Sequence, residues 1–139
     1  LFLMIFGLPS ERAMGGTRFL LLFLLAGALA NLAAAVLMDA PNRIIVGASG
    51  GVSAVMGAYL VLFPGARLGI VIPLGLFLEF VRAPASLLIG VWALLQVVFT
   101  FVGPAFGAVA WSAHLVGFLL GMLFGLLARP GVARRLRRG

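Results

Sequence analysis

Long stretches without charged residues dominate the pattern of hydrophobic and polar positions along this chain. They cover residues 19–38, 44–66 and 83–128. Because a helix needs about 20 apolar residues to cross a bilayer, the last stretch is long enough for two helices. The pattern predicts membrane helices over residues 17–38, 49–63, 84–102 and 109–128. The expected fold class is therefore all-α, a polytopic transmembrane helix bundle.

Turn-forming and charged residues separate these helices. They predict loops over Gly7–Gly16, Asp39–Val46 and residues 103–108. Residues 65–83 are ambiguous, because proline, glycine and charged residues interrupt an apolar run, and we interpret them as an interfacial segment. The first six residues resemble the end of a helix whose start is missing, so the chain is expected to be a fragment.

Composition supports a membrane protein. The chain has 139 residues, 64% of them hydrophobic, and a mean hydropathy of +1.27. Only 9% of the residues are charged, whereas soluble domains carry about a quarter. The chain contains no cysteine, which excludes disulfides and thiolate metal sites. The predicted organisation is one membrane domain over residues 1–128 and a basic cytoplasmic tail over residues 129–139.

The positive charge is a topology signal rather than a sign of nucleic-acid binding. All ten basic residues are arginines, and five of them lie in the tail. Cytoplasmic loops of membrane proteins are enriched in Arg and Lys. If the tail is cytoplasmic, alternation places loops 7–16 and 64–83 on the same side and leaves only Arg43 on the other. Residues 39–48 and 103–108 are then expected outside.

The first candidate for chemistry is Ser49, in the string Gly47-Ala48-Ser49-Gly50. Its predicted helix, residues 49–63, spans roughly 22 Å, which is less than the hydrocarbon thickness of about 30 Å. Ser49 should therefore lie below the outer surface, at the floor of a water-filled pocket. A helix start also presents free N–H groups and a positive dipole end, which favour an oxyanion.

The second candidate is His114, the only histidine, 65 positions after Ser49. Ionisable residues at membrane depth are costly and frequently functional. Small residues follow both candidates at helical spacing, which lets membrane helices pack closely. If the two faces pack together, Ser49 and His114 can meet near the outer ends of their helices. These packing residues are Ser53, Gly57, Gly117, Gly121 and Gly125.

No carboxylate is expected beside this pair, so the pattern favours a Ser–His dyad with His114 as base and then acid. Each feature taken alone has a simpler interpretation. The serine string is common in membrane helices, a single histidine can be an interhelical hydrogen-bond partner, and the glycines can serve packing only. Their combination favours catalysis. A small transporter or channel segment is an alternative, although no membrane-embedded acid is there to couple ions.

These residues resemble the rhomboid family of intramembrane serine proteases. Residues 47–59 resemble the nucleophile helix of the family and residues 113–121 resemble its histidine helix. The resemblance covers nearly the whole chain. It implies the six-helix rhomboid bundle, with about four complete helices and the end of another present in this chain. It also implies that residues 92–101 and the loop 103–108 form the gate and cap for substrate entry.

The resemblance implies peptide-bond hydrolysis in or near transmembrane segments of other membrane proteins, within a lipid bilayer. Ser49 is the nucleophile by this pattern and His114 the general base. The Ser49 N–H, with Gly47 and Gly50, lines the oxyanion region. The resemblance implies no metal and no cofactor. The implied location is a bacterial inner membrane with a cytoplasmic C-terminus. The sequence does not indicate an oligomeric state.

Two departures from the family pattern stand out. The His-x-x-x-Asn motif of the family would fall upstream of Leu1. Ser53 occupies a position at which some relatives carry an aromatic residue under the histidine ring, so the histidine needs support from elsewhere. A non-catalytic rhomboid-like protein that binds client transmembrane helices is therefore the main alternative function.

Overall fold

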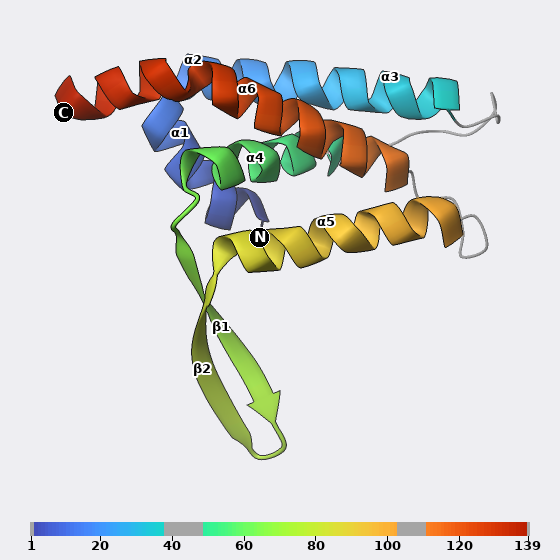
Figure 1. Ribbon diagram of the computed structural model, residues 1–139, viewed down its shortest axis with the longest axis vertical. Coiled ribbons are helices and arrows are strands. Elements are labelled where there is room, and N and C mark those ends of the chain that lie inside the picture. Colours follow the sequence, from blue (N-terminus) through green and yellow to red (C-terminus); the bar gives the residue numbers. More distant parts are fainter. Residues whose placement is uncertain (1, 38–48, 103–110, 139) are drawn as a thin grey trace.

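The computed structural model describes residues 2–37, 49–102 and 111–138, and Figure 1 shows a bundle of helices from which one hairpin projects. The predicted loops over residues 39–46 and 103–108, as well as Gly47, lie outside these described residues. In chain order the elements are η1 (Leu3–Gly7, π-helical), α1 (Leu8–Met14), α2 (Gly16–Leu21), η2 (Leu22–Ala26, π-helical), α3 (Gly27–Leu37), α4 (Ser49–Leu62), β1 (Arg67–Leu74), β2 (Phe77–Pro84), α5 (Ala85–Val102) and α6 (Trp111–Arg138).

Three described helical segments are long and apolar enough to cross a membrane: Gly16–Ala33, Ala85–Val102 and Ala113–Arg138. Many large apolar side chains on these helices are exposed, among them Leu24 at 55%, Leu94 at 63% and Leu123 at 53%. Such side chains suit contact with lipid, where the helical backbone satisfies its own hydrogen bonds. The predicted all-α membrane bundle is confirmed, and the chain is a multi-pass membrane protein.

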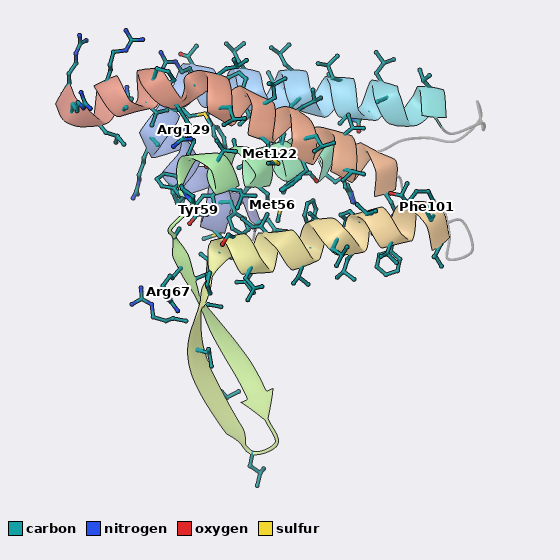
Figure 2. All side chains as sticks on the ribbon, in the orientation of Figure 1. Met56, Tyr59, Arg67, Phe101, Met122 and Arg129 are labelled. Carbon is teal, nitrogen blue, oxygen red and sulfur yellow. The ribbon has the colours of Figure 1, made fainter. Side chains whose placement is uncertain are left out.

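Helix α4 lies at the centre of the bundle and is the shorter apolar helix, with 14 residues. Nearly all of its residues from Gly50 to Tyr59 are buried. Figure 2 places Met56 and Tyr59 between α4 and α5, where they join a core that includes Ile89 and Phe118. Because α4 is surrounded by the other helices, their packing against it determines where its first residue, Ser49, lies.

The arginine-bearing ends of the elements gather at one end of the bundle. Figure 1 shows the start of α2, the base of the hairpin and the C-terminal end of α6 at the same end. Arg67 and Arg129 both lie there in Figure 2. Ser49 begins α4 at the opposite end, because α4 finishes beside the hairpin. The segments that carry these arginines thus lie at one end of the helices and the start of α4 lies at the other, as the topology argument requires.

The N-terminal segment differs from the prediction of a loop over Gly7–Gly16. Helix continues through α1 and breaks only at Gly15, whose φ of 91° favours glycine. Pro9 does not interrupt it, because Pro9 lies in the first turn of α1, where a missing N–H is tolerated. The Ser10 hydroxyl also donates a hydrogen bond of 2.7 Å to the Phe6 carbonyl.

Residues 67–84, which belong to the segment interpreted as interfacial, form an antiparallel hairpin. The strands pair from Arg67 opposite Pro84 to Leu74 opposite Phe77. Gly75 opens the turn with a φ of 63°, as tight hairpin turns favour. The strands are rich in β-branched and aromatic residues, which favour strand over helix. The hairpin is an addition to the otherwise helical fold, and Leu76 at its tip is 99% exposed.

Helix α6 extends beyond the predicted end at residue 128 and continues to Arg138, with Pro130 inside it. Val132 is only 6% exposed and belongs to the core. Packing of Val132 therefore holds the helix just beyond Pro130, whereas residues 133–138 are exposed. Arginine is a good helix former, which favours continuation of the helix there. The basic tail is thus the end of the histidine helix and packs back toward the start of α2.

Candidate functional site

Ser49 is the first residue of α4, and it is exposed. Within the described residues its hydroxyl makes no hydrogen bond, while its carbonyl accepts one of 2.8 Å from the Ser53 hydroxyl. Ser53 is 2% exposed, so this hydroxyl is satisfied inside its own helix. The N-terminal N–H groups of α4 are the ones that an α-helix leaves unbonded.

His114 lies in the first turn of α6 and is half-buried. Its Nδ1 is 2.8 Å from Oε1 of Gln96, a buried residue of α5 that is 6% exposed. An amide oxygen can only accept a hydrogen bond, so Nδ1 donates and carries the ring proton. In the neutral ring Nε2 is then unprotonated. Nε2 has no hydrogen-bond partner among the described residues, so it is available to accept a proton.

Aromatic side chains hold the imidazole from two helices. Trp111 meets the ring edge-on at a centroid distance of 5.9 Å, and Trp92 of α5 lies at 6.4 Å. Trp111 in turn stacks on Phe99 at 4.8 Å, and Trp92 packs on Phe118 at 5.6 Å. The ring is therefore fixed by one polar and two aromatic contacts, and α5 supplies the polar one.

Helices α4 and α6 run parallel and make the closest helix contact in the described structure. A methyl group on Gly117 would collide with the Gly50 carbonyl oxygen, and one on Gly121 with that of Ala54. One on Gly125 would lie 3.1 Å from the Ala58 Cα. The matched order along both helices shows that they are parallel. Small residues on each helix allow this approach of the two backbones.

This packing sets the relation between the two candidate residues. Ser49 directly precedes Gly50, and His114 lies one turn before Gly117, so both lie at the same end of the helix pair. No hydrogen bond joins Ser49 to His114 within the described residues. Catalytic hydrogen bonds are often long in the ligand-free state and shorten when substrate binds.

A third helix also reaches the start of α4. A methyl group on Gly50 would lie 3.0 Å from the Ala30 Cβ and 3.5 Å from the Asn31 Oδ1. Gly57, another small residue of α4, is close to the Phe118 carbonyl of α6. The expected packing residues thus lie at helix contacts, except that Ser53 is satisfied by its own helix through Ser49.

Gln96 was missed by the sequence reasoning. The signal was present, because Gln96 is an uncharged polar residue inside the long charge-free stretch. Polar side chains in membrane helices usually face the bundle interior and pair with one another. That rule points to Gln96 as a partner for the only histidine, although it could not select α5 as the neighbour of α6.

The fold and these contacts define a class: a polytopic membrane protein in which a serine helix and a histidine helix pack in parallel. The Rhomboid domain model matches residues 1–131 of the chain. The chain belongs to the rhomboid family, a family of intramembrane proteases, and the expected resemblance is confirmed. Searches of curated proteins and of solved structures gave no match.

Proposed function

We propose that the protein is an intramembrane serine endopeptidase that hydrolyses peptide bonds in or near transmembrane segments of other membrane proteins. The observation that carries this proposal is the common position of Ser49 and His114 at one end of the α4–α6 pair, with Nδ1 of His114 bonded to Gln96. Membership of the rhomboid family supports the same reaction class.

The proposed reaction begins with attack of the Ser49 Oγ on the scissile carbonyl carbon. His114 Nε2 takes the hydroxyl proton and then delivers it to the leaving amine, which breaks the peptide bond and leaves an acyl-enzyme. A water molecule then attacks the acyl carbon while the same nitrogen accepts its proton. Return of that proton to Ser49 releases the new carboxyl end and restores the enzyme.

The oxyanion formed in each step needs hydrogen-bond donors already in place. We assign this role to the N–H groups at the start of α4, beginning with that of Ser49, with Gly47 and Gly50 lining the region. Gly50 has no side chain, and Ala30 and Asn31 lie close beside it. A preorganised donor of this kind lowers the barrier by about 3 kcal/mol in a related reaction type.

Gln96 is proposed as a positioning residue in place of the third, acidic member found in many serine proteases. It keeps the Nδ1 proton in place and so directs the basic Nε2 toward substrate and serine. Its amide is neutral, so it does not require burial of a charge in the membrane. Since Ser53 bonds its own helix, support of the histidine comes from α5 instead.

The location proposed for the protein is a bacterial inner membrane with the C-terminus in the cytoplasm. The gathering of arginine-bearing ends at one end of the bundle supports this orientation. Ser49 then lies toward the opposite side, in reach of water from outside. Substrates on this proposal are transmembrane proteins, and nucleic acid is not among the partners.

A second candidate function is the binding of client transmembrane helices without cleavage. It is favoured by the lack of a hydrogen bond between Ser49 and His114 within the described residues. Labelling of the full-length protein with a fluorophosphonate separates the two. The protease proposal predicts covalent labelling that is lost in Ser49→Ala and strongly slowed in His114→Ala. Labelling that is absent, or equal in all three proteins, would favour the client-binding function.

A further inference from the structure

A second polar site lies at the other end of the bundle from Ser49. The start of α2 and the end of α6 enclose an open pocket of about 1000 Å³. Arginines from both parts of the chain line it: Arg12 and Arg18 from α1 and α2, and Arg134, Arg135 and Arg138 from α6. The proposed catalytic reaction uses none of these residues.

Two of these arginines reach across the gap between the helices. The Arg18 guanidinium lies against Gly131 of α6, with Nη1 2.6 Å from the position of an added methyl group. The Arg135 guanidinium lies over Gly15 in the same manner, at 3.4 Å, and its Nε donates to the Arg12 carbonyl at 3.5 Å. The glycines thus make room for the two guanidinium groups, each of which reaches from its own helix to the opposite wall of the pocket.

The positive charge of this pocket is not neutralised within the described residues. No carboxylate lines the pocket, and no ion pair is formed by the arginines in the described part of the chain. The carboxylate of Glu11 lies beside the pocket, with its Oε1 3.8 Å from the position of an added methyl group on Gly16. Like charges that line one pocket repel one another, so the pocket favours an anion.

The chemistry and the position of the pocket identify the kind of anion. Guanidinium groups match the oxygens of phosphate in charge and in paired hydrogen-bond geometry. The pocket lies where the spanning segments Gly16–Ala33 and Ala113–Arg138 begin and end, which is the headgroup level of a bilayer. Leu136 lines the pocket and is 59% exposed, so an apolar surface adjoins the cationic one. Basic pockets between membrane helices at the cytoplasmic headgroup level are suited to phospholipid headgroups.

We propose that this pocket binds a phosphate group, and that in the membrane the phosphate is that of an anionic phospholipid of the inner leaflet. The lipid phosphate lies between Arg18 and Arg135, and the acyl chains lie along the exposed apolar side of α6. Bound lipid then joins the start of α2 to the end of α6. The site requires no catalytic activity, so it stands independently of the proposed protease function.

The test is a binding titration of the full-length protein in mild detergent. The probes are dioctanoyl phosphatidylglycerol, dioctanoyl phosphatidylcholine and inorganic phosphate. Intrinsic fluorescence or native mass spectrometry gives each dissociation constant. The pocket variant is Arg18→Gln with Arg135→Gln. The matched control is Arg129→Gln with Arg137→Gln, which removes the same charge from arginines that do not line the pocket. Unfolding temperatures without lipid show that both variants are folded.

The proposal predicts that phosphatidylglycerol binds and phosphatidylcholine does not. The pocket variant should weaken phosphatidylglycerol binding by about tenfold or more, while the control changes it by less than about twofold. Equal loss in both variants would show diffuse attraction to the basic end and overturn the site. Binding of inorganic phosphate as tight as that of phosphatidylglycerol would overturn the lipid as the source of the phosphate. Absence of binding by all three probes would overturn the whole proposal.

Discussion

The buried amide oxygen of Gln96 lies 2.8 Å from Nδ1 of His114 and joins α5 to the only histidine of the chain. This contact fixes which ring nitrogen carries the proton. The residues 92–101, which contain Gln96, are also those that the family pattern assigns to the substrate gate. The orientation of the His114 imidazole is thus linked to the position of α5.

Loss of the Gln96 amide should impair the proposed chemistry more than substrate binding. We expect Gln96→Leu, of similar size, to lower kcat by about tenfold or more with little change in KM, because the base loses its orienting partner. Gln96→Glu keeps an acceptor oxygen and should recover much of the rate. The measurement is steady-state cleavage of a transmembrane substrate in liposomes.

The matched control for this prediction is the double variant. In a His114→Ala background, Gln96→Leu should have no further effect on the residual rate, because Gln96 acts through the imidazole. An unchanged kcat in Gln96→Leu, or an equal further loss in the absence of the imidazole, would contradict the positioning role.

The glycines between α4 and α6 should be intolerant of even one methyl group. We expect Gly121→Ala to lower the free energy of unfolding by about 1–3 kcal/mol, because its methyl group would collide with the Ala54 carbonyl. Gly90→Ala on α5 is the control, since nothing lies within 4 Å of an added methyl group there. That change should be neutral or slightly stabilising. Unfolding titrations in mixed detergent micelles measure both, and equal effects would refute close backbone packing at Gly121.

Ser53 offers a control for the choice of nucleophile. Its hydroxyl donates only to the Ser49 carbonyl within the described residues, so Ser53→Ala should retain fluorophosphonate labelling within a few-fold of the parent protein. The expected cost in stability is about 1 kcal/mol or less, typical of one lost hydrogen bond. Labelling that is abolished by Ser53→Ala but retained in Ser49→Ala would identify Ser53 as the nucleophile and contradict the assignment of Ser49.

Charge-free stretches predicted the helices α4 and α5 nearly to the residue, and the start of the helix after Gly15 within a residue. This success has a simple cause, because the length of an apolar run between charges is set by the bilayer. The prediction of a loop over Gly7–Gly16 was wrong, because α1 occupies Leu8–Met14. Gly7 and Pro9 were interpreted as helix breakers, whereas a glycine at a close contact and a proline in a first turn are both compatible with helix.

The hairpin and the histidine partner show where sequence alone was insufficient. Short apolar runs do not distinguish a strand from a buried or interfacial segment by periodicity, so residues 67–84 stayed ambiguous. Ser49 and His114 could be selected because a serine at a predicted helix start and the only histidine of the chain are each followed by small residues at helical spacing. Gln96 could not be paired with His114, because that contact depends on how α5 packs beside α6. The roles of all these residues in catalysis stay predictions.

The most direct measurement is cleavage of a model transmembrane substrate by the full-length protein in liposomes, beside its Ser49→Ala and His114→Ala variants. The account predicts a defined cleavage product from the parent protein and loss of that product in both variants, with folding of the variants shown by unchanged unfolding temperatures. Cleavage of equal rate in all three proteins, or none by the parent protein across several substrates, would contradict the Ser–His mechanism and leave client binding as the function.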